Sequence, residues 1–341
     1  LSVAILPLLG IGGAQMIKAE TSGPMKEQKL TPRIADTAKA LYLIYFGISF
    51  ACAVAYHLAG MEWKDAIMHM MTTVSLSGIS AHDSSYAFFH SALIDYVAVF
   101  FMAICGFNFS LHFLAWNKRN IFFYFKDPEA VSWLGTLLLL CAVTFLVISL
   151  KGTYAHWEDN LRYALFTVVS VASTTGFADT NYANWPQGLP ILLMIAAAFA
   201  TCAGSTGGGI KQIRLLILSR QLKRELTLLL YPKAAVPLRI GQVVIDNKIS
   251  FAVLVYVMVW IATYITGIVL LLLSGMATTE ALSAPFAMLT NLGPGLGHVG
   301  PVGTYAHLST LQLWICSFLM LIGRLEIFTV FVLFTKNFWK I

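Results

Sequence analysis

The sequence predicts an all-α polytopic membrane protein, built from repeated modules of helix, re-entrant loop and helix around a central axis. Three observations support this fold class. Of the 341 residues, 58% are hydrophobic and only 11% are charged, whereas soluble domains carry about 25% charged residues. Several apolar runs approach or exceed the ~20 residues that cross a hydrocarbon core. Shorter and more polar segments alternate with these runs, which indicates a repeated arrangement.

The apolar runs and the basic residues together predict the topology. The predicted membrane spans are 41–60, 93–116, 133–150, 249–273 and 308–334. Most of the 22 Lys and Arg residues lie in four clusters, at 18–39, 118–126, 211–248 and 336–340. The positive-inside rule places all four clusters in the cytoplasm. The net charge of +6 is therefore explained by topology, and nucleic-acid binding is not needed to account for it.

Spans, polar segments and basic loops recur in one order, which predicts four modules. Residues 1–37 would hold the last helix of a truncated first module and a cytoplasmic loop. Residues 38–132, 133–247 and 248–341 would be the second, third and fourth modules. The chain starts without Met and already inside an apolar stretch. We therefore expect it to be a fragment that lacks the part before this helix.

Each complete module contains a middle segment that is too short and too polar to span the membrane. These segments are 63–80, 157–177 and 277–297. Each has an acidic start, about three to four helical turns, and then Thr or Ser and Gly, which is ordinary helix punctuation. A helix of ~12 residues covers ~18 Å, about half of a bilayer. We expect three re-entrant half-helices that enter from outside and end near the middle of the membrane.

The ends of these half-helices have the chemistry of a cation site. The C-terminal end of a helix carries partial negative charge, which favours a cation at the membrane centre. The extended residues that follow are tolerated only where they line a water- or ion-filled path. Backbone carbonyls, helped by Thr and Ser hydroxyls, can replace the hydration shell of an ion such as K⁺. Several copies around an axis would complete a ring, which predicts a potassium-channel-like fold around a central pore.

Five motifs give the chain a specific resemblance. They are "TTVSLSGIS" (72–80), "STTGF" (173–177), "AGSTGGGIK" (203–211), "TNLGPGLG" (290–297) and "GRLEIF" (323–328). With these motifs the chain resembles the pore-forming subunits of the Trk/Ktr/HKT potassium-uptake superfamily over essentially its whole length. The resemblance implies a non-enzymatic, K⁺-conducting protein without a bound cofactor. The filter residues that it implies are Ser77, Gly78, Ile79, Thr174, Thr175, Gly176, Asn291, Leu292 and Gly293. The filter of the first module has no match, so the preference between K⁺, Rb⁺ and Na⁺ stays open.

A glycine cluster interrupts the apolar run that starts at Pro190. A break in a helix at membrane depth is acceptable only where it faces a cavity. The resemblance implies a mobile intramembrane loop that gates the pore just below the filter. Its core would be Ala203, Gly204, Ser205, Thr206, Gly207, Gly208 and Gly209. A patch of glycines that packs helices together is the alternative.

Arg324 lies well inside the predicted span 308–334, and an intramembrane charge is a functional hypothesis by default. We expect it to face the pore below the filter or to contact the glycine loop. A structural ion pair with a carboxylate is the alternative. Glu326 lies two positions further on and points to another helix face, so it is not the expected partner of Arg324.

Two other functions stay open at this point. One is a symporter that couples K⁺ to Na⁺ or H⁺, although no acidic residue lies obviously in the middle of a span. The other is a membrane-embedded hydrolase that uses Ser205 with His112 or His307. The resemblance implies a homodimer in the bacterial inner membrane. It also implies a cytosolic nucleotide-binding regulatory ring as partner, which is called TrkA in the Trk systems.

Overall fold

The computed structural model describes residues 34–186, 188–199, 201–336 and 338–339. The predicted helix at 1–17 and most of the first basic cluster lie outside these residues. The elements of the first half are α3 (Ile34–Leu58), α4 (Trp63–Val74), η1 (Ser85–Phe88), α5 (Ala92–Cys105), α6 (Phe109–Asn117), α7 (Phe123–Lys126), α8 (Pro128–Leu150), α9 (Trp157–Ala172) and η2 (Tyr182–Asn184). Those of the second half are α10 (Gly188–Phe199), α11 (Gln212–Leu230), β1 (Arg239–Ile240), β2 (Val243–Val244), α12 (Asn247–Leu273), α13 (Thr278–Thr290), η3 (Gly297–Val299), α14 (Thr310–Arg324) and α15 (Ile327–Val332).

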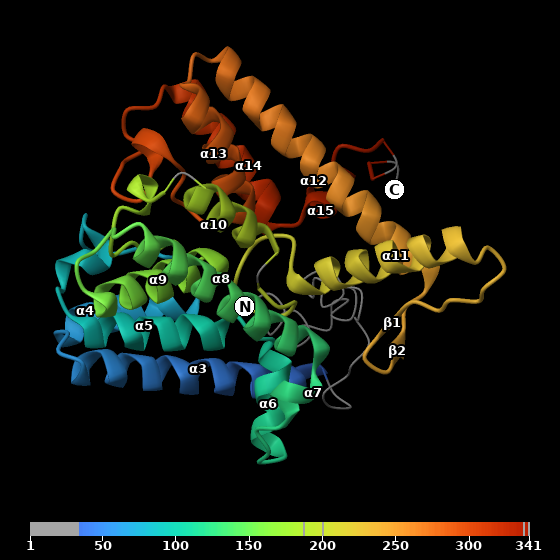
Figure 1. Cartoon of the computed structure of the whole chain (residues 1–341), viewed down its shortest axis with the longest axis horizontal. Coiled ribbons are helices and arrows are strands. Elements are labelled where there is room, and N and C mark those ends of the chain that lie inside the picture. The colour runs from blue at the N-terminus through green and yellow to red at the C-terminus, as the bar shows by residue number, and fades with distance from the viewer. Residues whose placement is uncertain (1–33, 187, 200, 337, 340–341) are drawn as a thin grey trace.

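The helices form two groups that α10 connects. In the first group α4 packs against α3 and α5, and α9 packs against α5 and α8. In the second group α13 packs between α12 and α14. Helix α10 contacts both α9 and α13, and it lies between the two groups in Figure 1. The short helices α4, α9 and α13 are thereby brought towards one central region.

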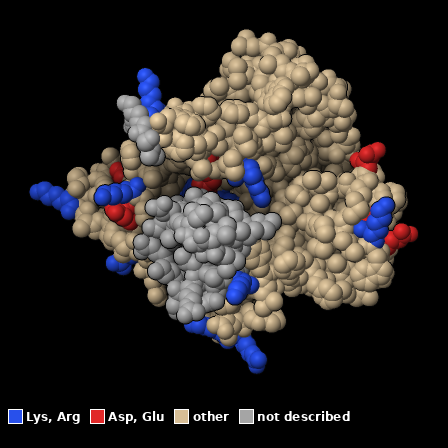
Figure 2. Space-filling view, turned by 180° about the vertical axis from the view of Figure 1, so that it is seen from behind, with Lys and Arg blue, Asp and Glu red and all other residues tan. Residues whose placement is uncertain are grey.

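The long helices have the composition of membrane spans. Residues Lys39–Leu58 of α3, all of α8 and all of α12 are long and apolar enough to cross a membrane by length and composition. Only 22–33% of the residues in their most apolar windows are buried inside the chain. Most of these residues are therefore not fully buried within the chain, which leaves apolar surface available for lipid contact. On the face in Figure 2, most of the surface is neither acidic nor basic.

The predicted span 93–116 is sharply bent. Helices α5 and α6 meet at a bend of 91°. The bend follows Gly106, where a Cβ atom would lie 2.6 Å from the Trp133 ring. Its backbone is bonded to the glycine-rich segment of the third module, because Cys202 N donates to Gly106 O at 3.0 Å and Phe109 N donates to Gly204 O at 3.1 Å. Long-range hydrogen bonds thus hold the chain in the bent form.

The predicted span 308–334 is also interrupted. Helix α14 ends at Arg324, Glu326 has a left-handed φ of 61°, and α15 begins at Ile327. Arg324 is therefore at the end of a helix, not in the middle of one.

The basic stretch 211–248 contains α11 and a small antiparallel hairpin. Arg239 pairs with Val244, and Ile240 pairs with Val243. The buried side chains of this region form their own apolar cluster, which consists of Ile213, Ile217, Leu238, Ile240, Ile245 and Val253. The hairpin therefore packs against the beginnings of α11 and α12 (Figure 1).

Candidate functional site

The three half-helices end where the sequence predicts. Helix α4 has 12 residues and ends at Val74, α9 has 16 and ends at Ala172, and α13 has 13 and ends at Thr290. Each has an acidic residue in its first turn. Their lengths of about 18–24 Å are shorter than the ~30 Å hydrocarbon core of a membrane.

The backbone after each half-helix follows the same pattern. A non-glycine residue with a left-handed φ is followed two positions later by a glycine with positive φ. The pairs are Leu76 (52°) with Gly78 (66°), Thr174 (58°) with Gly176 (85°), and Asn291 (57°) with Gly293 (95°). A left-handed non-glycine residue costs about 1–3 kcal/mol, and such strain clusters at functional sites. Three repeats of one strained pattern indicate a shared constraint on the direction of the carbonyls.

We call residues 76–78, 174–176 and 291–293 the post-helix segments. Aligned on their glycines, they include eight of the nine residues expected to form the filter. Ile79 lies one position beyond this register and is 70% exposed. Leu76, which the sequence did not single out, takes the position equivalent to Thr174 and Asn291. A leucine between two serines gives no sequence evidence of a left-handed backbone.

The post-helix segments lie side by side. A Cβ atom on Gly78 would be 1.8 Å from Thr175 O, and a Cβ atom on Gly176 would be 2.0 Å from Leu292 O. Segment 76–78 therefore touches segment 174–176, which in turn touches segment 291–293. No L-side chain fits at either glycine, because real Cβ atoms are not found closer than 3.0 Å to such atoms. The structure thus places the backbone segments that hold the three predicted glycines side by side.

The hydroxyl groups of the third module support its post-helix segment. Ser170 Oγ donates to Phe177 O at 2.7 Å, and Ser173 Oγ lies 2.6 Å from Thr175 Oγ1. Ser173, Thr174 and Thr175 are at most 1% exposed. These bonds tie the end of α9 to the segment that follows it, so the carbonyls have few alternative directions.

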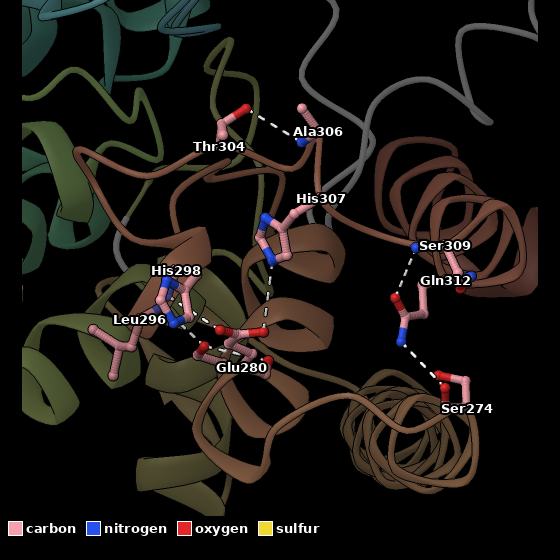
Figure 3. Close-up of polar contacts among 10 residues, drawn as sticks. Ser274, Glu280, Leu296, His298, Thr304, Ala306, His307, Ser309 and Gln312 are labelled. Atoms are coloured by element: carbon pink, nitrogen blue, oxygen red, sulfur yellow. Dashed lines mark hydrogen bonds and ion pairs between the residues drawn. The ribbon is translucent and has the colours of Figure 1, made fainter.

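Acidic residues in the first turns of the half-helices contact the loops that follow the post-helix segments. In the fourth module, Glu280 Oε1 accepts from His298 N at 3.2 Å, and Glu280 Oε2 lies 3.8 Å from His307 Nε2 (Figure 3). Ser283 Oγ accepts from Leu296 N at 2.9 Å. Figure 3 also shows the Ser309 and Gln312 capping pair, which begins α14 and reaches Ser274.

The second and third modules contain related contacts. Asp65 Oδ2 lies 3.2 Å from His82 Nε2. In the third module Arg162 lies 3.4 Å from Asp159 and 3.8 Å from Asp95. Asp179 follows the post-helix segment 174–176, and burial raises the pKa of its carboxyl group. First-turn acids thus contact the loops that follow segments 76–78 and 291–293, and Asp159 lies beside an arginine of its own helix.

The glycine-rich break forms a loop directly against the half-helix ends. We call residues 201–211, between α10 and α11, the intramembrane loop. Thr206 Oγ1 donates to Val74 O at 2.9 Å, and Gly208 N donates to Thr174 Oγ1 at 2.7 Å. A Cβ atom on Gly208 would be 2.1 Å from Thr290 O. The loop therefore contacts the C-terminal end of each described half-helix.

The close packing explains why the loop is rich in glycine. At Gly207 a Cβ atom would be 2.5 Å from Thr201 Cγ2, and at Gly209 it would be 2.8 Å from Ala197 O. At Gly204 it would be 2.8 Å from Asn108 Oδ1, beside the α5–α6 bend. The predicted residues from Ala203 to Gly209 all belong to this loop.

Arg324 contacts the loop, as one of the two sequence hypotheses proposed. Its Nη1 donates to Thr206 O at 3.3 Å. Glu326 pairs with Arg214 at 3.1 Å instead. Lys211 belongs to a basic cluster in the sequence, but its side chain is buried and donates from Nζ to Gly207 O. The loop is therefore held by cationic side chains from its own end and from the end of α14.

The geometry does not form the Ser–His pair of a hydrolase. Ser205 Oγ donates to Cys202 O at 2.7 Å. Both ring nitrogens of His112 are engaged, with Tyr124 Oη at 2.6 Å and Ile104 O at 3.1 Å. His307 lies by Glu280 at the other end of α13. Among the described residues, no group of three or more His, Cys, Asp or Glu side chains could hold a metal ion.

Comparisons with known proteins give one family. The family model described as "TrkH: Cation transport protein" matches residues 1–341. The chain is 43% identical over 340 residues to the Trk system potassium uptake protein TrkH of Halomonas elongata, and 40% identical over 340 residues to that of Escherichia coli K12. Each alignment covers 100% of this chain and 70% of the relative.

A solved structure agrees with the sequence relatives. The crystal structure of the potassium transporter TrkH from Vibrio parahaemolyticus matches with a TM-score of 0.87 at 39% identity. This match covers 100% of the chain and 69% of that structure. The predicted all-α membrane fold is confirmed by this agreement. The chain belongs to the TrkH family of cation transport proteins.

Proposed function

We propose that this chain forms most of a K⁺-uptake pore whose selectivity filter consists of the post-helix segments. One observation carries the proposal, namely the same strained backbone pattern at three adjacent half-helix ends. A change in the sign of φ between neighbouring residues turns successive carbonyls towards one side. Carbonyls collected in this way can replace the hydration shell of K⁺, while the half-helix ends add negative potential.

We also propose the four-module organisation, with modules at 38–132, 133–247 and 248–341 after a first module that ends in 1–37. Its support is the recurrence of a half-helix and a post-helix segment at equivalent places in three modules. The sequence in which the segments contact one another supports it too, because Gly78 contacts Thr175 and Gly176 contacts Leu292.

The intramembrane loop is proposed as the gate. It contacts Val74, Thr174 and Thr290 at the inner ends of the half-helices. An ion that leaves a filter at these segments would meet the loop next. Arg324, bonded to Thr206 O, would add a positive charge at the same level and so oppose cation flow.

A channel-like mechanism is proposed over coupled K⁺/Na⁺ or K⁺/H⁺ symport. Its support is that the proposed filter would bind the ion through backbone carbonyls, which do not take up protons. We further propose a homodimer in the bacterial inner membrane that is regulated by a TrkA-like cytosolic ring. The exposed basic surface of α11 and the hairpin supplies a cytoplasmic region for such a partner.

Flux measurements on the full-length protein in proteoliposomes test the function. We expect K⁺ and Rb⁺ to pass and to be preferred over Na⁺, and the reversal potential to follow the K⁺ gradient alone. A reversal potential that shifts with the proton or Na⁺ gradient would favour symport. If the full-length protein passed neither K⁺ nor Rb⁺ when assembled with its Trk partners, the proposed pore would be contradicted.

A further inference from the structure

Glu129 connects the beginning of α8 to both ends of the intramembrane loop. It is the second residue of α8 and is only 8% exposed. Its Oε1 atom accepts from Ala203 N at 2.7 Å and from Ile213 N at 3.1 Å. These donors lie on opposite sides of the glycine-rich segment, 10 positions apart in sequence. One carboxylate oxygen thus joins the entry and the exit of the loop.

The Glu129 carboxylate accepts hydrogen bonds from two backbone N–H groups that lie outside regular helical hydrogen bonding. Ile213 is in the first turn of α11, where N–H groups lack intrahelical acceptors. The N-cap residue Lys211 makes no side-chain capping bond. Glu129 therefore caps α11 from another helix, and its negative charge also suits the helix N-terminus. At Ala203 it satisfies an irregular backbone that would otherwise be costly at membrane depth.

The same face of α8 strengthens the attachment. Ser132 and Thr136 lie three and seven positions after Glu129 and so share its helix face. Their hydroxyl oxygens accept from Gln212 Nε2 at 2.6 and 3.1 Å. Gln212 N also donates to Thr201 O at 2.8 Å, which closes the base of the loop. The end of the loop is therefore attached to α8 through two residues one turn apart, Ser132 and Thr136.

A first-turn acid usually serves its own helix and faces water, and Glu129 does neither. Asp127 already caps α8 by accepting from Ala130 N at 2.8 Å. A buried carboxylate is costly unless it is well hydrogen-bonded. The bonds recorded for Glu129 Oε1 go to the loop and to α11, so its burial is explained by holding those segments.

We propose that Glu129 is a clasp that positions the intramembrane loop against the half-helix ends. The loop can leave those ends only when α11 loses this cap and Ala203 loses its acceptor. The inference rests on the proposed gate, but it specifies a residue outside the pore that sets the resting position of the gate. Glu129 acts through the backbone of the loop and is a positioning residue.

Native Cys202 reports on the clasp because it adjoins Ala203 and is only 1% exposed. We would measure the rate at which a small methanethiosulfonate reagent labels it in the full-length protein in membranes. The variants are Glu129→Ala and Glu129→Gln, each compared with the same variant carrying Cys202→Ala to subtract the other cysteines. Glu158→Ala is the matched control, since Glu158 is likewise the second residue of its helix but is exposed.

Charge-assisted hydrogen bonds contribute more than neutral ones, so we expect Glu129→Ala to speed labelling at least about tenfold. Glu129→Gln keeps an acceptor oxygen and should give a smaller increase, and Glu158→Ala should match wild type. Wild-type labelling in Glu129→Ala would overturn the clasp. If Glu129→Ala does not fold, wild-type labelling in Glu129→Gln would overturn it instead. Faster labelling without any rise in basal K⁺ flux would support the clasp and overturn the proposed gate.

Discussion

Replacing Gly176 with alanine tests the filter geometry through a contact that the structure defines. Gly176 has φ of 85°, and its Cβ atom would lie 2.0 Å from Leu292 O and 3.0 Å from Pro294 Cδ. Because backbone oxygens do not approach a Cβ atom closer than 3.0 Å, the post-helix segments 174–176 and 291–293 must separate by at least about 1 Å. The left-handed backbone adds strain of about 1–2 kcal/mol.

We expect this separation to lower the preference for K⁺ over Na⁺ about tenfold, which corresponds to about 1.4 kcal/mol. Displaced carbonyls no longer match the ion that they dehydrate. The assay is Rb⁺ uptake against Na⁺ competition in proteoliposomes with the full-length protein. Gly152→Ala is the matched control, because Gly152 has φ of 62° but no atom within 4 Å of its Cβ position. A folded Gly176→Ala protein with unchanged selectivity would refute the reasoning.

Three other predictions concern the loop and its supports. Deletion of residues 207–209 should raise K⁺ flux in the absence of an activating partner, and unchanged flux in proteoliposomes would remove the gate from the account. Arg324→Ala should also raise basal flux because it removes a positive charge and a bond to the loop, whereas the exposed Arg220→Ala should not; equal currents from both variants would contradict this role. Glu280→Ala should destabilise the fold by about 1–3 kcal/mol because the His298 N–H loses a carboxylate acceptor, and a denaturation midpoint equal to wild type would show that the contact contributes little.

The half-helices could be predicted because their determinants are local. An acidic first turn, a few helical turns and a Ser/Thr–Gly end recur at fixed places, and α9 ends at Ala172, directly before the "STTGF" motif. The expectation for Gly78, Gly176 and Gly293 came from the family resemblance of the motifs that contain them. The left-handed backbone of Leu76 could not, because it depends on the neighbouring segments and not on the side chain.

The breaks in the predicted spans could not be found from the sequence because long-range contacts stabilise them. The α5–α6 bend is bonded to Cys202 and Gly204, about a hundred residues later in the chain. Neither Gly106 nor Asn108 distinguishes a sharp bend from a packed helix. Glu129 is similar, since its sequence position indicates an ordinary first-turn acid and only the fold brings the loop to it. The hairpin at 239–244 was hidden in a basic stretch whose charges indicated topology alone.

The location of bound ions tests the central claim most directly. An experimental structure of the full-length protein in Rb⁺, with the ions located by their anomalous scattering, would show where cations bind. The account predicts Rb⁺ density on the axis between the carbonyls of residues 76–78, 174–176 and 291–293, above the intramembrane loop. Rb⁺ bound elsewhere in the membrane region, with no density among these three segments, would contradict it.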